Sequence, residues 1–348
     1  MSGHGVPPQL TLTGFLENTG ARLHFYDMGR RVTPIPRDRF LAFEQASEPY
    51  PYPLQHKAWF ALVQEHAQAL SEPLIWFLRF DLDEQAKLVQ ATRDYLIHRF
   101  VELATERPAA ADLGQAMRDN PYAFAPREDK MANLHARVHR DLGLGPSQYY
   151  AHARDYLTGG PGWEQWSFVG YQGLADIAAR QDQDDNAVIL SAAIPQLPNE
   201  PLAALCQCLE NHPPGEALAA ALWARLQTAV EDRHTPPAIL AALLRGQSQA
   251  AAEQVTDAVL LLLQDARARD PEILAAIGGR AWEALQRPEV ARAYLQRLAS
   301  EGVEQTIFDH CVSDLLRLPG LQAQLLAVLR AEDRSETVAK AFQAMLQR

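Results

Sequence analysis

Three stretches in the second half of the chain decide the fold: Pro201-Leu-Ala-Ala-Leu205, Pro237-Ala-Ile-Leu-Ala241 and Pro271-Glu-Ile-Leu274. They lie 36 and 34 residues apart, and each proline stands where the first helix of a pair would start. A unit of about 35 residues cannot bury its apolar face alone, so neighbouring units must stack. The sequence therefore predicts an array of antiparallel helix pairs.

The second helix of each pair is also visible as apolar residues at helical spacing. The second helices cover residues 218–226, 255–263 and 290–298. Weaker units flank the three pairs at residues 188–194 before them and at 307–316, 321–329 and 338–346 after them. The consensus residues of tetratricopeptide and ankyrin repeats are missing. Residues 163–348 are therefore expected to form an all-α, HEAT-like solenoid, although Ala- and Leu-rich hairpins also build compact bundles.

The first 106 residues show a different periodicity. Apolar and polar residues alternate around the turn 27–31, which predicts a hairpin, and two aromatic-rich stretches predict further strands of one antiparallel sheet. The expected strands are 23–26, 32–35, 56–63 and 73–81, and the expected helices are 37–45 and a long helix from Asp83 to about Glu106. We expect residues 1–106 to form a small α+β domain in which helices cover a sheet.

Residues 107–162 hold short helices and loops and are expected to connect the two architectures, with Gly159-Gly160-Pro161-Gly162 as the clearest break. The predicted protein is mainly α-helical overall.

Composition limits the class of protein. The chain has 348 residues, 47% of them hydrophobic, which is enough for two domains without disulfides. The longest apolar run, residues 258–263, is far shorter than the roughly 20 residues that a bilayer requires. Residues 1–10 do not resemble an export signal. The odd number of cysteines, three, favours a reducing compartment, so we expect a cytoplasmic protein.

The charge is unevenly distributed. The net charge is −11, and residues 160–348 hold 24 acidic and 15 basic residues. Nucleic-acid binding depends on Lys and Arg that neutralise phosphates, so the acidic solenoid disfavours it and fits a basic or neutral protein better. A basic strip of Arg30, Arg31, Arg37 and Arg39 keeps nucleic acid as a weaker third hypothesis.

The chain has none of the common phosphate, dinucleotide, acyl-transfer or zinc-protease motifs. His135 and His139 are spaced i, i+4, which places two imidazoles on one helical face, and His152 and Asp155 follow. This is the best metal candidate, but two such histidines are more often solvated. We therefore expect no metal, no cofactor and no catalytic residues.

The turn Asp27-Met-Gly-Arg30-Arg31 could hold a carboxylate or phosphate through its two arginines. An exposed turn with solvated arginines is the alternative. Trp59 and Trp76, on neighbouring predicted strands, could pack as a core pair or line a groove. Asp27, Arg30, Arg31, Trp59 and Trp76 are therefore the candidate ligand- or partner-binding residues.

Two further groups have simpler interpretations. Asp182, Asp184 and Asp185 resemble part of a calcium loop, but the glycine and distal glutamate are missing, so we interpret them as a solvated helix cap. Cys206, Cys208 and Cys311 are interpreted as packing residues.

Three stretches of the first domain also point to a family: residues 12–16, the hairpin 25–31 and residues 51–59. They resemble the DUF3549-type proteins of gammaproteobacteria, a family of unknown function. The resemblance extends along the whole chain and implies a full-length bacterial cytoplasmic protein, but it supplies no activity and no site residues.

Two functions remain as hypotheses. The first is a non-enzymatic adaptor whose helical repeats bind a protein or peptide. The second is a small-ligand sensor or enzyme with a site between the first domain and the connector, formed by Arg30, Arg31, His135 and His139.

Overall fold

The computed structural model describes residues 11–18, 20–66, 73–106 and 120–347. Two compact units divide between Pro126 and Arg127. A four-stranded antiparallel sheet with three helices forms the described part of the first unit, and the described part of the second unit is helical. The expected fold class, a small α+β domain followed by an all-α region in a mainly helical protein, is confirmed.

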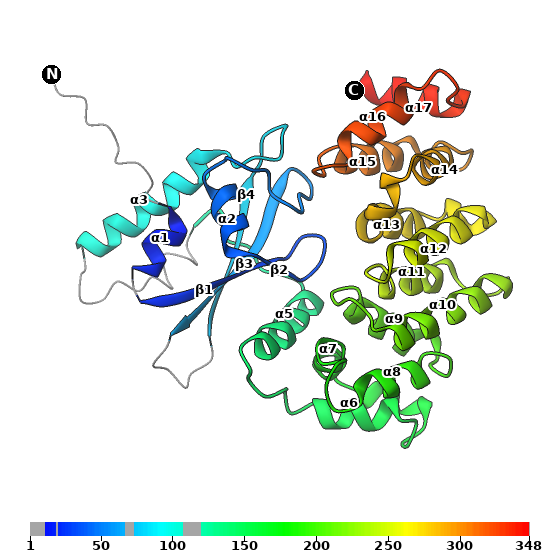
Figure 1. The fold of residues 1–348 in the computed structure, drawn as a ribbon, viewed down its shortest axis with the longest axis horizontal. Coiled ribbons are helices and arrows are strands. Elements are labelled where there is room, and N and C mark those ends of the chain that lie inside the picture. Colours follow the sequence, from blue (N-terminus) through cyan, green and yellow to red (C-terminus); the bar gives the residue numbers. More distant parts are fainter. Residues whose placement is uncertain (1–10, 19, 67–72, 107–119, 348) are drawn as a thin grey trace. The chain divides into compact units, whose positions relative to one another are not determined.

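The sheet of the first unit has the strand order β2-β1-β3-β4 (Figure 1). Its strands are β1 (Ala21–Asp27), β2 (Thr33–Ile35), β3 (Lys57–His66) and β4 (Leu74–Asp81). All neighbours pair antiparallel, and Phe25 lies opposite both Ile35 and Leu62. The four strands expected from the sequence are therefore correct to within a few residues.

One face of the sheet packs against helices α1 (Leu12–Glu17), α2 (Arg37–Glu44) and α3 (Gln90–Glu106). The core between them is aromatic because Phe25 stacks on Phe40 at 3.8 Å, and Phe40 meets Phe60 edge-on at 5.0 Å. Such ring pairs add specific geometry to apolar burial. The alternation of the strands thus directs one set of side chains into a single core.

Helix α3 begins later than the sequence predicts. The expected start, Asp83, instead forms a turn in which its carboxylate accepts hydrogen bonds from the backbone N–H groups of Gln85 (2.9 Å) and Lys87 (2.8 Å). Ala86 in this turn has a positive φ of 58°, which a helix does not allow. Aspartate competes with the helix for backbone donors in this way.

Thirteen helices described in the second unit form two layers in which each helix packs on its neighbours in the same layer (Figure 1), and helices such as α10 and α11 pack across the layers. The first layer contains α5 (Glu128–Asp141), α7 (Tyr171–Ala179), α9 (Asn199–Leu209), α11 (Pro237–Gly246), α13 (Pro271–Arg280), α15 (Gln305–Leu315) and α17 (Glu336–Leu346). The second layer contains α6 (Tyr150–Leu157), α8 (Asn186–Ala193), α10 (Glu216–Glu231), α12 (Ala252–Gln264), α14 (Pro288–Leu298) and α16 (Gln322–Arg330). Short 3-10 helices η1 (Trp163–Phe168), η2 (Ala266–Arg269) and η3 (Trp282–Gln286) lie in the connections.

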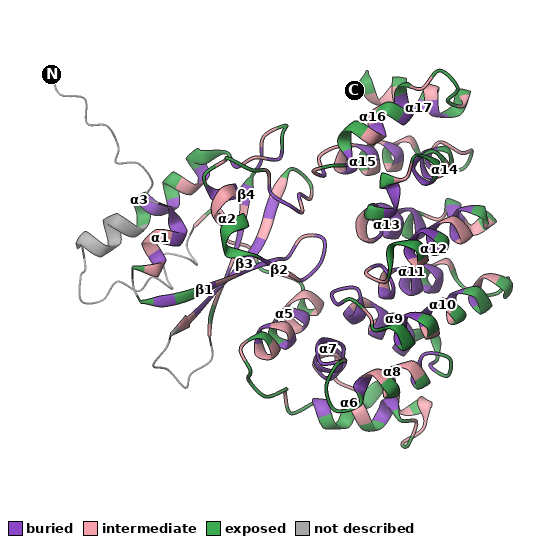
Figure 2. Cartoon of the chain, in the orientation of Figure 1, coloured by how far each residue is buried: buried purple, intermediate pink, exposed green. Residues whose placement is uncertain are grey.

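The proline-led starts are where the sequence places them. Pro237 and Pro271 are the first residues of α11 and α13, and Pro201 lies in the first turn of α9. The Asp270 side chain also caps α13 by accepting a hydrogen bond from the N–H of Glu272 at 2.9 Å. Figure 2 shows the buried residues of these helices along the sides that face neighbouring helices.

The array begins within the segment that the sequence analysis treated as a connector. Helices α5 and α6 belong to the second unit and pack on α7 and α8, whereas residues 107–119 lie outside the described residues. Helix α5 gives a weak apolar signal because its buried residues include Asn133 and only three aliphatic side chains.

Side-chain hydrogen bonds join successive pairs in the second layer. Gln254 of α12 donates to the carbonyl of Ala219 in α10 at 2.8 Å. Arg297 of α14 donates to the carbonyl of Leu263 in α12, and Arg267 of η2 donates to the carbonyl of Val230 in α10 at 2.7 Å. Leu263 and Val230 lie in the last turns of their helices, where backbone carbonyls have no partner within their own helix.

No described helix combines the length and apolar character that a membrane crossing demands.

Candidate functional site

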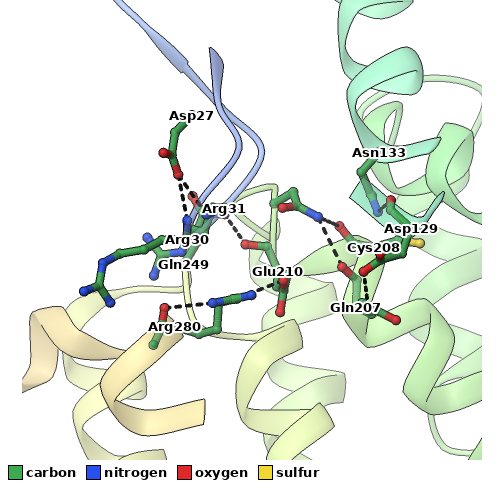
Figure 3. A network of polar contacts seen from close by, with 12 residues as sticks. Asp27, Arg30, Arg31, Asp129, Asn133, Gln207, Cys208, Glu210, Gln249 and Arg280 are labelled. Carbon is green, nitrogen blue, oxygen red and sulfur yellow. Dashed lines mark hydrogen bonds and ion pairs between the residues drawn. The ribbon is translucent and has the colours of Figure 1, made fainter. Parts of the chain in front are cut away.

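The Asp27 carboxylate organises the turn after β1. One oxygen accepts hydrogen bonds from the backbone N–H groups of Arg30 (3.0 Å) and Arg31 (3.1 Å), and the other accepts from Gly29 (3.3 Å) and the Tyr50 hydroxyl (2.9 Å). Figure 3 shows Asp27 above the two arginines. The carboxylate is fully buried, so its acceptor capacity serves the turn itself.

The arginines of this turn do not extend into solvent. Arg30 and Arg31 are both buried, and the Arg30 Nε donates to the carbonyl of Pro53 at 2.9 Å. The exposed turn with solvated arginines is therefore wrong. Three backbone donors converge on Asp27 and fix the conformation of the turn.

Trp59 lies beside this turn, but Trp76 does not. The Trp59 carbonyl accepts hydrogen bonds from the Met28 N–H (2.8 Å) and the Tyr50 hydroxyl (3.0 Å), and its indole N–H donates to Leu54 (3.0 Å). Its ring meets Phe124 edge-on at 5.0 Å. The sequence-predicted residues that come together are therefore Asp27, Arg30, Arg31 and Trp59.

The predicted pair of Trp59 and Trp76 is wrong. Trp59 lies opposite Arg79 in the β3–β4 register, whereas Trp76 lies opposite Leu62, an odd number of residues away along β3. Side chains alternate between the faces of a strand, so the two indoles point to opposite sides of the sheet. Trp76 belongs to the core that faces the helices.

The histidines of α5 do share the expected i, i+4 spacing. His135 is exposed, and the Nδ1 of the half-buried His139 lies 3.2 Å from the carbonyl of Gly145. Among the residues that the structure describes, His, Cys, Asp and Glu side chains form no cluster of three that could hold a metal ion. His152 and Asp155 lie on α6 and are both exposed.

The three aspartates 182, 184 and 185 have separate roles. Asp182 pairs with Arg140 at 2.8 Å, and Asp184 accepts a hydrogen bond from the Tyr150 hydroxyl at 2.8 Å. Asp185 is the N-cap residue of α8, as expected, but its side chain makes no capping bond and its φ is 59°. Asn186 fixes this end of the helix instead, because its amide donates to Arg180 and Tyr150 at 2.8 Å.

Buried cysteines pack in the array, as the sequence suggests. Cys206 and Cys208 are fully buried, and burial raises the pKa of the Cys208 thiol to about 12. Cys311 is half-buried, and burial raises its pKa as well. A thiol of this kind stays protonated near neutral pH and is a poor nucleophile.

Polar links across the first layer were missed by the sequence analysis. Arg280 of α13 pairs with Glu210, the residue after α9, at 2.9 Å (Figure 3). The Gln249 amide donates to the Glu210 carbonyl at 2.7 Å, and Gln207 of α9 donates to Asp129 of α5. Each link joins residues that lie far apart in sequence, so no local pattern announces it.

His212 is a further buried polar group of the first layer. Its Nδ1 lies 3.3 Å from the Arg137 guanidinium, and burial beside Arg137 and Arg140 lowers its pKa to about 3. The imidazole is therefore neutral near physiological pH and accepts the arginine's hydrogen bond. This contact ties the loop after α9 to α5.

An aromatic surface element was also missed. None of the six residues of η1 is buried, although three of them are Trp163, Trp166 and Phe168. Phe168 is 72% exposed, and Tyr149 nearby is 48% exposed. The available signal was the aromatic density directly after the glycine-rich break, which we interpreted only as a boundary.

These features define a two-unit protein in which a small sheet domain precedes a two-layer helical array. The chain belongs to the family described as a protein of unknown function (DUF3549), whose model matches residues 9–346. No curated protein and no solved structure shows significant similarity to the chain.

Proposed function

We propose that the protein is a non-enzymatic adaptor that binds a protein or peptide partner through its helical array. The observation that carries this proposal is the continuous two-layer stack from α5 to α17. Stacked helix pairs create extended surfaces whose area grows with the number of pairs, and repeat proteins use such surfaces to bind other macromolecules.

The hydrogen bonds between pairs support this role. Arg267 and Arg297 each bind a carbonyl at the end of a preceding second-layer helix, and the Arg280–Glu210 pair joins α13 to the end of α9. A surface held in one shape before it meets its partner loses less conformational entropy on binding. The array therefore has the rigidity that an extended binding surface needs.

Charge favours a basic or neutral partner surface, because residues 160–348 hold 24 acidic and 15 basic residues. Exposed carboxylates occur in both layers, for example Glu272 of α13 and Asp257 of α12. We place this role in the cytoplasm, which the three free cysteines fit.

The ligand-sensor alternative gains less support. Asp27 directs its carboxylate at its own turn, and the Arg30 Nε binds the Pro53 carbonyl. His139 lies against the Gly145 carbonyl. Arg30 and His139, two of the four groups that we had assigned to a small-ligand site, thus have local structural roles.

The test is to tag the full-length protein in its native bacterium, cross-link it, and quantify co-purifying proteins by mass spectrometry. We expect a specific protein in near-stoichiometric amounts, and its recovery without cross-linking should fall as the salt concentration rises. A variant with Glu216→Gln, Asp257→Asn and Glu289→Gln neutralises exposed second-layer carboxylates, and one with Glu200→Gln, Glu272→Gln and Glu304→Gln does the same at first-layer helix starts.

Loss of the partner with one variant set and not the other identifies the layer that binds. Recovery of no protein above the level of a tag-only control would overturn the adaptor proposal. Equal circular dichroism and thermal unfolding of the variants and the wild type serve as the control for folding.

A further inference from the structure

The aromatic patch consists of Tyr149, Trp163, Trp166, Phe168 and Val169, at the connection between α6 and α7. Phe168 is 72% exposed, the highest exposure of any large apolar side chain in the described residues, and its neighbour Val169 is half-buried. Both tryptophans are half-buried. Contiguous exposed apolar side chains of this size mark interaction sites on soluble proteins.

The patch is held in a defined shape. The Tyr149 ring covers Gly170, where an added Cβ would come within 3.1 Å of its Cδ1 atom, and the Trp163 ring covers Gly159 at the same distance. The buried Tyr156 meets Trp163 at 5.5 Å and Trp166 at 6.2 Å, and its hydroxyl donates to the Trp163 carbonyl at 3.1 Å. Aromatic side chains fixed in this way offer contact area at a small entropic cost.

Two acidic side chains lie beside the patch. Glu164 lies between the two tryptophans in sequence, and its carboxylate is the group nearest to Gly162. The Asp155 Oδ1 lies near Gly160, 3.5 Å from where a Cβ on that residue would stand. Among the described residues, neither carboxylate lies within ion-pair distance of a basic side chain, in contrast to Asp182, which pairs with Arg140.

We infer that the aromatic patch is the docking site for a basic segment of a partner protein, whose apolar side chains contact Phe168 and Val169 while its Lys or Arg side chains meet Asp155 and Glu164. The occupant follows from charge complementarity, because carboxylates around an apolar centre select cations and repel acids. An anionic membrane surface is disfavoured for the same reason. This inference rests on the proposed adaptor function and assigns it a location.

The test is selection from a phage library of random twelve-residue peptides on the immobilised full-length protein. The selected clones are then measured as synthetic peptides, by tryptophan fluorescence and by calorimetry, on three proteins. These are the wild type, the Phe168→Ser, Val169→Ser variant, and a Leu346→Ser control that removes an apolar side chain of 70% exposure from α17. Phe168 and Leu346 are exposed and Val169 is half-buried, so equal circular dichroism and thermal unfolding of the three proteins is the control for folding.

We expect peptides rich in Lys or Arg next to aliphatic residues, which shift the tryptophan emission. The patch variant should bind them more weakly by about tenfold or more, while the Leu346 control binds as the wild type does. Asp155→Asn with Glu164→Gln should weaken binding and reduce its dependence on salt.

Three results would overturn the inference: no enriched clones, enriched clones that bind the patch variant equally well, or acidic clones. Binding of the wild type to phosphatidylglycerol vesicles through Phe168 would replace the protein partner with a membrane. A cellular partner that the patch variant still captures in full would refute this location and leave the adaptor proposal intact. Failure to capture any partner would refute the adaptor proposal instead.

Discussion

The Arg267 guanidinium lies 2.7 Å from the carbonyl oxygen of Val230, and so binds the last turn of α10 from the connection that follows α12. The same side chain donates to the carbonyls of Asp232 (2.9 Å) and Thr235 (3.0 Å), and Asp265 pairs with it at 2.8 Å. One arginine thus serves three backbone acceptors of the preceding pair, which have no helical partner of their own.

Arg267→Ala should therefore destabilise the protein by roughly 1–3 kcal/mol, because buried or half-buried carbonyls lose a charged donor. The measurement is urea unfolding followed by circular dichroism. Arg269→Ala is the matched control, since Arg269 lies on the same short helix but is exposed, and its side chain makes no hydrogen bond or ion pair with the described residues. Equal stability of the two variants would show that the Arg267 contacts contribute nothing.

Two adjacent glycines in α13 should respond to alanine in opposite ways. A Cβ at Gly278 would come within 2.6 Å of the hydroxyl oxygen of Tyr294, which donates to the Leu274 carbonyl at 2.9 Å, whereas a Cβ at Gly279 meets nothing within 4 Å. Gly278→Ala should cost about 1–3 kcal/mol through overpacking. Gly279→Ala should be neutral or stabilise by about 0.5–1 kcal/mol. Thermal unfolding distinguishes the two, and destabilisation by both variants to the same extent would contradict the packing at Tyr294.

Glu44 should make the stability of the first unit depend on pH. Its buried carboxylate accepts hydrogen bonds from the Leu12 N–H and from the Thr13 hydroxyl (2.7 Å), and so caps α1 from another helix. Burial raises the pKa of Glu44, and these hydrogen bonds oppose the rise only in part. The folded state thus holds the proton more tightly than the unfolded state, in which glutamate titrates near about 4.3.

This contribution to stability is fully present below the unfolded pKa and is lost as pH rises through the folded pKa. Compared with Glu44→Gln, which cannot titrate, the wild type should therefore lose stability as pH increases from about 4 to about 7. Urea unfolding of both proteins across that range measures the difference. A difference that stays constant, or a wild type that gains stability relative to the variant, contradicts the raised pKa.

Only one of the three cysteines should react in the folded protein. Cys206 and Cys208 are fully buried, whereas Cys311 is half-buried. Titration with a disulfide reagent such as DTNB should label Cys311 alone, slowly because burial raises its pKa, and all three thiols after unfolding in urea. Cys311→Ser should abolish labelling of the folded protein. Native labelling of that variant would show that the α9 packing opens.

The parts of the fold that sequence reasoning predicted are those that depend on local chemistry. Pro237 and Pro271 start helices because their missing N–H groups cost nothing in a first turn, and alternation around residues 23–26 identifies β1. The predicted start of α3 was wrong because the Asp83 carboxylate binds the N–H groups of Gln85 and Lys87 and holds a turn in place of the first helical turn. The sequence alone does not show which of the two conformations forms.

The candidate sites were harder to predict because they depend on which face of the sheet a side chain points to and on contacts with residues that are distant in sequence. Trp59 and Trp76 were placed on the correct strands, but whether their side chains share one face of the sheet depends on the register between β3 and β4. The Asp27 turn was recognised, whereas the burial of its arginines involves acceptors distant in sequence, such as the Pro53 carbonyl for Arg30. The exposed Phe168 could not be distinguished from a core aromatic, because both have the same sequence signature.

Three arginine hydrogen bonds between helix pairs run in one direction along the array. Arg225 binds the carbonyl of Leu197, Arg267 that of Val230 and Arg297 that of Leu263, so in each case a later pair supplies the donor and an earlier pair the acceptor. At these three joints, removing the later pair leaves a carbonyl without its charged donor, while removing the earlier pair leaves only a flexible cation that water can solvate. We therefore expect loss of structure to pass these joints more readily from the carboxy-terminal end toward α5 than in the opposite sense.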